Sequence, residues 1–288
     1  MSAAVARPAA LDSSARAEVR ALSAAVQHAV GQPPLSDQAL TKLGDTDVRH
    51  VVMREGDRLV GYAQLAGTSV ELAGDAAAVP GLLTALEPLP DGVEIWSHGK
   101  SSPTGPVLEA RGYHAVRRLH QLRRPLDPLP PETALPDGVI IRPFVPGADD
   151  AAWLALNAAA FADLPDQGDW HLDDLQARQR EDWFDPTGFL LADRDGDLLG
   201  FHWTKVHTAE LGEVYVLGIH PAAQGMRLGS ALLQRGLAYL AGRGCAEVLL
   251  YVDDANTAAL RLYESAGFTR YDLDVLWGRT GISASDMS

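Results

Sequence analysis

Gln224-Gly-Met-Arg-Leu-Gly229 lies between a strand-like run, residues 213–219, and a helix-like run, residues 228–243. A glycine-containing turn that joins a strand to a helix presents backbone N–H groups and the positive end of the helix dipole to an anion. Taken alone, a Gln-Gly-x-x-x-Gly run also fits an ordinary turn before a helix. Because the run lies between this strand and this helix, we predict that residues 224–229 form a phosphate-binding turn, called the phosphate turn below.

The patterns around this turn predict a mixed α/β domain in the second half of the chain. Strands are expected at residues 139–144, 188–192, 198–206, 211–219 and 247–252 and from residue 268 onward. Helices are expected at residues 149–162, 170–180, 228–243 and 256–266. We expect these elements to form a twisted mixed sheet flanked by helices.

A proline-rich stretch separates the two halves of the chain. Residues 125–137 hold five prolines, at positions 125, 128, 130, 131 and 136. Proline lacks the N–H that a helix interior or a central strand needs, so this stretch predicts a semi-rigid linker. With 288 residues the chain is long enough for two domains. We expect an N-terminal domain at residues 1–126, the linker at 127–137 and a C-terminal domain at 138–288.

The N-terminal half repeats parts of the C-terminal half in the same order. Residues 56–62 (Gly-Asp-Arg-Leu-Val-Gly-Tyr) parallel residues 196–201 (Gly-Asp-Leu-Leu-Gly-Phe), and residues 108–113 parallel residues 263–268. The common order predicts a duplication, with chance similarity between short glycine-containing runs as the alternative. Residues 69–79 have no Gln/Arg-x-x-Gly turn. We therefore expect the first copy to lack the strand–turn–helix and to be degenerate.

Composition argues against several classes of function. A formal net charge of −14 is unfavourable for a nucleic-acid partner, which requires a basic surface. No apolar run approaches the roughly 18 residues of a membrane span, and the N-terminus lacks an apolar leader. The single cysteine, Cys245, fits a reducing cytoplasm and is equally typical of a small buried hydrophobic residue. We find no metal-ligand spacing, and we expect a cytoplasmic monomer without a metal.

Two polar side chains of the second half suit acid–base chemistry. Glu213 begins an apolar strand, and its carboxylate could take a proton from an ammonium group, directly or through water. The alternative is a solvated strand start. Tyr263 lies in the helix predicted at residues 256–266, and its phenol could protonate a departing thiolate, with packing on the sheet as the alternative. Acyl transfer from a thioester to an amine needs both a base and an acid, together with stabilisation of the oxyanion.

The phosphate turn and Asn256-Thr-Ala-Ala-Leu-Arg-Leu-Tyr-Glu-Ser-Ala-Gly-Phe268 together resemble the acetyl-CoA-binding core of the GNAT superfamily of N-acetyltransferases. The resemblance implies acetyl-CoA as co-substrate. The cofactor-binding residues expected on this basis are Leu217, Gly218, Ile219, Gln224, Gly225, Met226, Arg227, Leu228, Gly229, Ser230, Asn256, Thr257, Ala258, Ala259, Leu260 and Arg261. The superfamily pattern, Gln/Arg-x-x-Gly-x-Gly/Ala, has glycine where this chain has Arg227. Asn256 could equally cap its helix.

Longer stretches resemble the mycothiol synthase family, in which two tandem acetyltransferase domains share one chain and the C-terminal domain is catalytic. The similar stretches are Trp183-Phe-Asp-Pro186, Leu199-Gly-Phe-His-Trp-Thr-Lys-Val-His207, Leu211-Gly-Glu-Val-Tyr-Val-Leu-Gly-Ile219, Pro221-Ala-Ala-Gln-Gly225 and Leu250-Tyr-Val-Asp-Asp-Ala-Asn-Thr-Ala-Ala-Leu-Arg-Leu-Tyr-Glu264. The resemblance implies transfer of acetyl from acetyl-CoA to the cysteine amine of des-acetylmycothiol. This substrate is a cysteinyl-glucosaminyl-inositol pseudodisaccharide, and the product is mycothiol.

The same resemblance implies roles for individual residues. Glu213 and Tyr263 are expected to be the catalytic base and acid. The expected substrate contacts are Asp37, Glu181, Lys205, Glu213 and Tyr251. Asp37 could instead be a helix-start residue, Glu181 a solvated helix end and Lys205 a surface residue.

Two other functions stay open at this point. The enzyme could acetylate another amine, such as an aminoglycoside or a protein N-terminus, or the chain could be a non-catalytic acyl-CoA-binding protein. The length of the matching sequence around Lys205 and Glu213 argues against a different acceptor. The presence of both Glu213 and Tyr263 argues against a pure binding protein, because such a protein needs no proton donor beside the sulfur.

Overall fold

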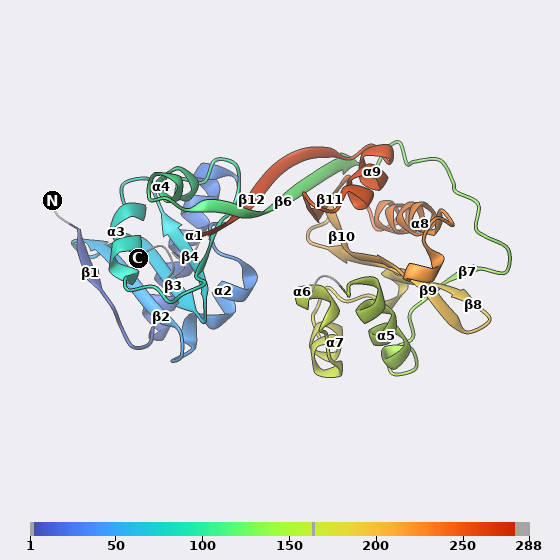
Figure 1. The fold of residues 1–288 in the computed structure, drawn as a ribbon, viewed down its shortest axis with the longest axis horizontal. Helices are drawn as coiled ribbons and strands as arrows, with labels where there is room; N and C mark the ends of the chain where they lie inside the picture. Colours follow the sequence, from blue (N-terminus) through green and yellow to red (C-terminus); the bar gives the residue numbers. More distant parts are fainter. Residues whose placement is uncertain (1–2, 163–164, 280–288) are drawn as a thin grey trace, which may run out of the picture. The chain divides into compact units, whose positions relative to one another are not determined.

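The computed structural model describes residues 3–162 and 165–279 of the chain (Figure 1). Its contacts define two compact units. The first unit comprises the chain up to His120, Asp253–Ala255 and the segment that begins at Asp272; the second comprises Gln121–Val252 and Asn256–Tyr271. The expected division into residues 1–126, 127–137 and 138–288 stays a prediction, and its outermost residues, 1–2 and 280–288, lie outside the described part.

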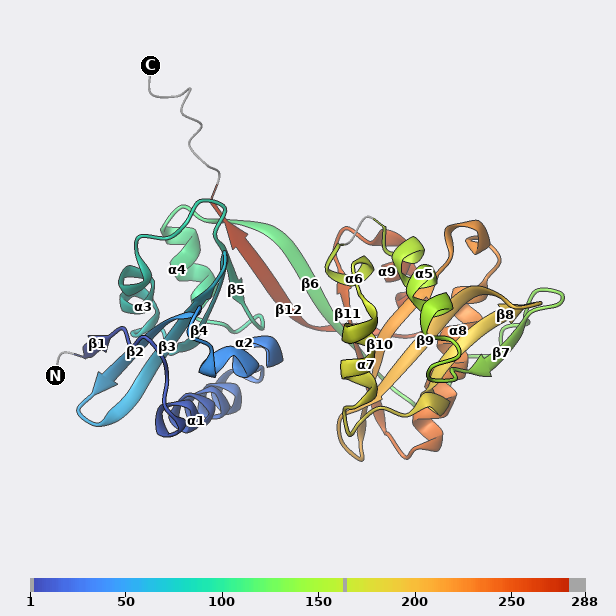
Figure 2. The same ribbon diagram turned by 90° about the horizontal axis from the view of Figure 1, so that it is seen from below.

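The first unit is a sheet with helices on both faces, as Figure 2 shows. Its strands are β1 (Ala4–Ala6), β2 (Arg49–Glu55), β3 (Arg58–Ala66), β4 (Ser69–Gly74) and β5 (Glu94–Ser97). Its helices are α1 (Ser13–Val30), α2 (Asp37–Thr41), α3 (Val79–Leu86) and α4 (Thr104–Ala110), with a 3-10 turn at Lys42–Gly44. Apolar residues of α1 and α2 pack on one face of the strands, and those of α3 and α4 pack on the other.

The expectation that the first unit lacks the strand–turn–helix is wrong. Strand β4 leads into helix α3, and the chain then returns as β5, which pairs parallel to β4. Helix α3 has 8 residues, whereas its counterpart in the second unit has 15. The turn between β4 and α3 needs no glycine pattern, because the Asp75 carboxylate accepts the N–H groups of Ala77 and Ala78. The crossover is therefore kept, and only the glycine turn is absent.

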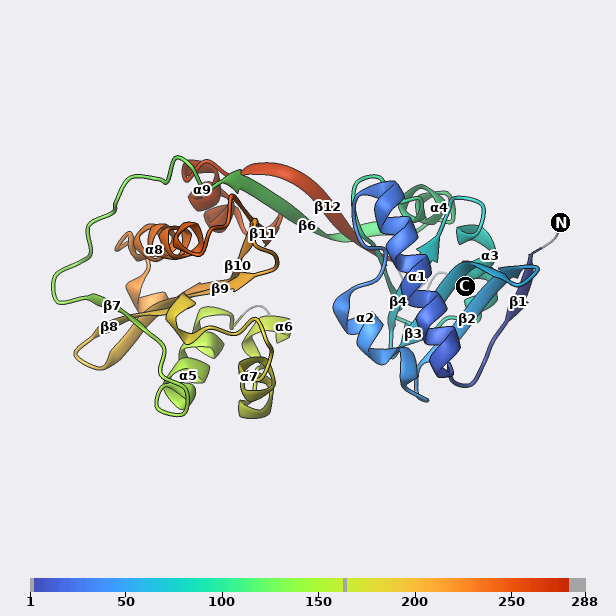
Figure 3. The ribbon, with the colours of Figure 1, turned by 180° about the vertical axis from the view of Figure 1, so that it is seen from behind.

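The second unit contains the elements expected around the phosphate turn (Figures 1 and 3). Its strands are β7 (Ile140–Pro143), β8 (Phe189–Arg194), β9 (Asp197–Val206), β10 (Leu211–Ile219) and β11 (Glu247–Asp253, of which Asp253 belongs to the first unit). Its helices are α5 (Asp150–Ala160), α6 (Pro165–Gly168), α7 (Leu172–Gln179), α8 (Leu228–Gly242) and α9 (Thr257–Ser265), with 3-10 turns at Pro186–Gly188 and Pro221–Ala223. The predicted strands and helices of this half are confirmed to within a few residues; α6 was not expected.

The last strands of the two repeats are exchanged. β6 (His114–Pro125) follows the first repeat and β12 (Thr269–Gly278) follows the second. Yet in the strand order β12 is the neighbour of β5, and β6 is the neighbour of β11. β12 pairs antiparallel with β5, with Leu276 opposite Trp96. Each of these two strands has residues in both units.

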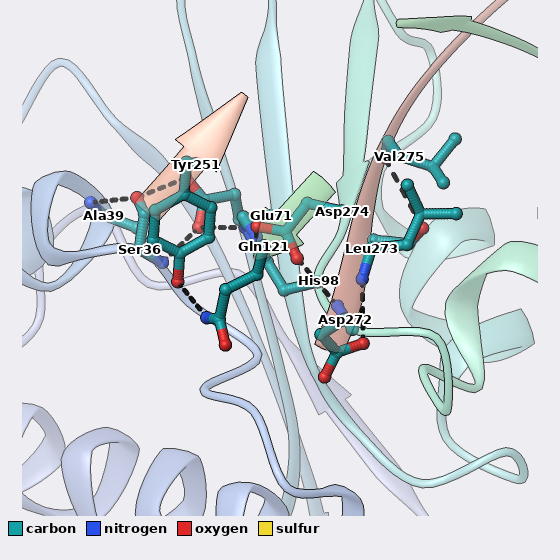
Figure 4. Close-up of polar contacts among 12 residues, drawn as sticks. Ser36, Ala39, Glu71, His98, Gln121, Tyr251, Asp272, Leu273, Asp274 and Val275 are labelled. Carbon is teal, nitrogen blue, oxygen red and sulfur yellow. Dashed lines mark hydrogen bonds and ion pairs between the residues drawn. The ribbon is translucent and has the colours of Figure 1, made fainter. Parts of the chain in front are cut away.

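A buried charge cluster attaches β12 to the first unit (Figure 4). His98 Nδ1 lies 3.0 Å from a carboxylate oxygen of Asp274 on β12, and Nε2 lies 3.4 Å from Glu71 Oε2 on β4. Asp274 also accepts the backbone N–H of Gly99, and Glu71 accepts the backbone N–H and the hydroxyl of Ser36. Burial alone would lower the pKa of His98, but the two carboxylates outweigh it and raise that pKa to about 9.

This cluster predicts a loss of stability at alkaline pH. A histidine whose pKa is raised by folding contributes stability that is fully present below about pH 6.5 and is lost as the pH rises through about 9. At about 1.4 kcal/mol per pKa unit, the contribution is at most about 3 kcal/mol. The melting temperature of the wild type should fall more steeply between pH 6.5 and 9.5 than that of His98→Gln. Parallel profiles would contradict this reading; the exposed His114→Gln serves as the control.

Helix α8 packs closely on β9 through a glycine. His202 is fully buried on the α8 face of β9, and its Nδ1 bonds the carbonyl of Leu232 at 2.9 Å. Burial lowers the pKa of His202 to about 4, so the ring is neutral near pH 7. A Cβ atom at Gly236 would lie 2.0 Å from two ring atoms of His202. Glycine is therefore required at this helical position.

We expect Gly236→Ala to destabilise the protein. Alanine usually favours a helix by about 1 kcal/mol over glycine, but here the methyl group would overpack the His202 ring at a cost of about 1–3 kcal/mol. Gly242→Ala at the end of the same helix is the matched control, because a Cβ atom added there would meet no atom within 4 Å. Thermal unfolding should give a lower melting temperature for Gly236→Ala and an unchanged or higher one for Gly242→Ala. The opposite order would contradict the packing described.

Candidate active site

A β-bulge at the centre of β10 sets the direction of its side chains. The register with β9 shifts between Val214 and Val216. Val214 consequently packs on the α8 and α9 side, whereas Val216 packs on the α5 and α7 side. In a regular strand these two residues, two positions apart, would point to the same side. Glu213 precedes the bulge and lies opposite Lys205 on β9. Both of these side chains share the α5 and α7 side with Trp203, because residues two apart on a strand point the same way.

β10 and β11 separate immediately after Glu213. Their parallel pairing covers only Leu211–Glu213 and Glu247–Leu249, although β10 continues to Ile219 and β11 to Asp253. From Val214 onward β10 still pairs with β9. Among the residues that the structure describes, the β11-facing edge of this half of β10 therefore has no strand partner, and its backbone groups are available to a ligand.

The Glu213 carboxylate is buried and hydrogen-bonded. Its residue is 8% exposed, so the alternative of a solvated strand start is wrong. Glu213 Oε2 lies 2.7 Å from Nε2 of His207, which follows the end of β9. The sequence analysis assigned no role to His207. Its spacing from Lys205 could have indicated one, because residues two apart on a strand point the same way and His207 therefore lies on the side of the sheet that Glu213 faces.

Lys205 lies over two aromatic rings. Its Nζ atom is 4.9 Å from the ring centre of Trp183 and 5.6 Å from that of Tyr215. Tyr215 is held in turn by Arg178 of α7, which donates to the Tyr215 hydroxyl at 3.2 Å. No carboxylate of the described residues lies within ion-pair distance of Lys205. Cation–π contacts of this kind fix a lysine while leaving its N–H groups able to donate.

The other predicted substrate contacts are spread over the chain. Tyr251 on β11 has the same orientation as Leu249, the partner of Glu213, and its hydroxyl accepts a 2.7 Å bond from Gln121 Nε2 (Figure 4). Glu181 is exposed beyond the end of α7, two residues before Trp183. Asp37 is the exposed first residue of α2 in the other unit, next to the N-cap Ser36. Lys205, Glu213 and Tyr251 thus come together on one face of adjacent strands, whereas Asp37 and Glu181 occupy helix ends.

Tyr263 lies on the opposite side of the sheet from Glu213. It packs in the core formed by α8, α9 and β11, edge-on to Phe268 with ring centres 5.7 Å apart. Burial raises the pKa of Tyr263 above its ordinary value, so the phenol keeps its proton. Within the described residues the structure gives its hydroxyl no hydrogen-bond partner. A donor of this kind is available to a ligand atom.

The separation of β10 and β11 lies between the two candidate catalytic groups. Glu213 stands on the α5 and α7 side, at the point where pairing ends, and Tyr263 stands on the α8 and α9 side. A flat group lying along the unpaired edge of β10 would therefore have the Glu213 carboxylate on one face and the Tyr263 phenol on the other. A carboxylate and a phenol are groups that can act as base and acid in acyl transfer.

The phosphate turn has two residues with left-handed backbone conformation. Gly225 has φ of 81°, and Arg227, the N-cap of α8, has φ of 60° and ψ of 16°. The left-handed region is open to a non-glycine residue at a cost of about 1–2 kcal/mol, so arginine occupies this position with some strain. The N–H groups of Leu228, Gly229 and Ser230 begin α8 and have no acceptor inside the helix. Backbone N–H groups of this kind at a helix N-terminus can bind an anion.

Several expected cofactor residues have structural roles as well. Asn256 caps α9, since its side chain accepts the N–H of Ala259 at 3.0 Å. Gly218 is required by packing, because a Cβ atom there would lie 2.5 Å from the Phe201 ring. Leu217 and Ile219 contact the cluster beneath the start of α8. Cys245 is buried in the core of α8 and β11, and burial raises its thiol pKa. Among the described residues no group of His, Cys, Asp and Glu side chains could hold a metal ion.

Residues 153–268 match the model of the acetyltransferase (GNAT) family. The chain is 48% identical to the mycothiol acetyltransferase of Thermomonospora curvata, and the alignment covers 90% of this chain and 92% of that protein. It is 45% identical to the mycothiol acetyltransferase of Thermobispora bispora, and this alignment covers 91% of this chain and 95% of that protein. The chain belongs to the mycothiol acetyltransferase family. It is therefore an acyl-CoA-dependent N-acetyltransferase whose reaction forms mycothiol.

Solved structures share this fold over nearly the whole chain. A GCN5-related N-acetyltransferase from Sphaerobacter thermophilus covers 98% of this chain and is itself covered to 98%, with a TM-score of 0.70 and 24% identity. A tandem GNAT protein from the clavulanic acid biosynthesis pathway covers 96%, is covered to 98% and has a TM-score of 0.66 at 18% identity. These likenesses establish the tandem GNAT fold that the resemblance implied. No helix in residues 3–162 or 165–279 has the length and apolar character of a membrane crossing.

Proposed function

We propose that Glu213 and Tyr263 carry out the two proton transfers of acetyl transfer to des-acetylmycothiol. The amine of the cysteinyl group loses a proton to Glu213, directly or through water, and its nitrogen attacks the thioester carbonyl carbon. The carbon–sulfur bond then breaks, and Tyr263 gives its proton to the leaving thiolate. The observation that carries this proposal is the strand separation, which begins at Glu213 and has Tyr263 on its other side.

We propose that acetyl-CoA lies along the unpaired edge of β10 with its pyrophosphate at the phosphate turn. Backbone groups of Leu217, Gly218 and Ile219 would hold the thioester and the pantetheine arm. The pyrophosphate would accept N–H groups of residues 224–230, and the first turn of α9, residues 256–261, would flank the arm. The unsatisfied amides that begin α8 and the positive helix end support this placement.

We propose that the pseudodisaccharide binds on the α5 and α7 side of the sheet. Lys205 offers donors beside Glu213, and Tyr251 lies on the same face, which suits a substrate with many hydroxyl groups and one ammonium group. Asp37 and Glu181 are retained as proposed further contacts of this substrate. We also propose that the protein is cytoplasmic, since its only cysteine is a buried thiol that fits a reducing compartment. We propose in addition that it works as a monomer.

The acceptor is tested by mass spectrometry of des-acetylmycothiol incubated with acetyl-CoA and enzyme. We expect the pseudodisaccharide to gain one acetyl group on its amine, and free cysteine and an aminoglycoside to gain none. Fragmentation distinguishes the acetylated amine from an acetylated thiol, which a thiol-trapping colour assay could not do. Acetylation of the aminoglycoside instead would favour a different acceptor. Absence of both products and of acetyl-CoA binding would indicate that Arg227 disables the phosphate turn.

A further inference from the structure

His207 holds one oxygen of the Glu213 carboxylate. The distance from His207 Nε2 to Glu213 Oε2 is 2.7 Å. An ionised carboxylate only accepts hydrogen bonds, so Nε2 must carry the hydrogen when Glu213 is charged. Because that nitrogen is already protonated, His207 cannot take the substrate proton from Glu213 through the same bond. Its role is therefore to hold the carboxylate rather than to relay the proton.

The other cationic side chain beside Glu213 makes its contacts with aromatic rings. Lys205 lies directly opposite Glu213 in the β9–β10 register, but its Nζ atom lies over the rings of Trp183 and Tyr215. His207 is thus the side chain of the described residues that orients this base. Its side chain is 33% exposed, whereas that of Glu213 is 11% exposed. The histidine is consequently the part of the pair that solvent reaches.

We propose that His207 is the positioning residue of the catalytic base: it fixes Glu213 Oε2 and leaves Oε1 to accept the ammonium proton. The inference rests on the proposed role of Glu213. It requires that Glu213 and His207 act as one unit, so that the effect of changing one depends on the presence of the other.

The charged neighbours of this pair have contacts of their own. The charged groups on this side of the neighbouring strands are Lys205 on β9, Glu213 on β10 and Glu247 on β11, and Glu247 is paired with Arg123 of β6 at 3.0 Å.

Two substitutions separate positioning from packing. In His207→Gln the amide nitrogen reaches about as far as Nε2, so the donor is kept. In His207→Asn the amide nitrogen reaches only as far as Nδ1, so the bond to Glu213 is lost. We expect kcat at pH 8 to fall by about 10–100-fold in His207→Asn and by only a few-fold in His207→Gln.

Equal losses in the two variants would overturn the proposal and leave His207 a packing residue. Melting temperatures identify any variant that fails to fold, and His114→Asn, an exposed histidine of the first unit, is the control. The same series in a Glu213→Gln background separates the two proposals. If Glu213→Gln keeps full activity, the role of Glu213 as base fails. If Glu213→Gln is impaired and His207→Asn is not, only the inference about His207 fails.

Discussion

Glu213→Gln is expected to lower kcat by a factor of about 10²–10⁴, the usual contribution of a general base. Glutamine has the size of glutamate, so the packing of β10 between β9 and β11 should persist. What disappears is the capacity to accept a proton from the substrate ammonium. The rate is measured as acetylated pseudodisaccharide formed per unit time at saturating acetyl-CoA.

The control for this prediction is Glu264→Gln, which changes an exposed glutamate on α9. It removes the same charge from the protein without touching the base. Acetyl-CoA affinity should be unaltered in both variants, because Glu213 faces the acceptor side of the sheet. If the activity of Glu213→Gln stays within a few-fold of wild type across the pH range, another group must remove the proton.

Tyr263→Phe is expected to lower kcat by a similar factor of about 10²–10⁴, because the departing thiolate loses its proton donor. The change removes one oxygen from a buried ring that packs edge-on to Phe268. The hydroxyl has no hydrogen-bond partner among the described residues, so its removal leaves no protein group unsatisfied. Stability should therefore be kept or slightly increased while the rate falls.

The measurement pairs initial rates with thermal unfolding of the same preparation. Tyr271→Phe, on β12, is the control for loss of an exposed phenol. A lower melting temperature for Tyr263→Phe in proportion to its lost activity would mean that the hydroxyl supports the fold rather than the reaction. A normal rate would assign protonation of the sulfur to another donor or to water.

Much of the catalytic half could be predicted because its signals are local. The strand at Leu211–Ile219 has the bounds expected, and α8 begins at Leu228 as expected. Proline and glycine positions, apolar periodicity and the Asn256 cap act within a few residues, so they can be read along the chain. The presence of α3 was missed because its turn is stabilised by the Asp75 side chain instead of a glycine pattern.

The same distinction between local and non-local features applies to the candidate site. The sequence by itself predicted a phosphate-binding turn after β10 and named Glu213 and Tyr263 as acid–base candidates, because these follow from residue types at fixed local spacing. Only the tertiary structure decided that His207 bonds Glu213, that Lys205 lies on Trp183, and that β12 pairs with β5. Those contacts join residues on different elements, and their geometry depends on strand register, a single bulge and buried charge pairing. Such non-local contacts cannot be derived from residue types at local spacing.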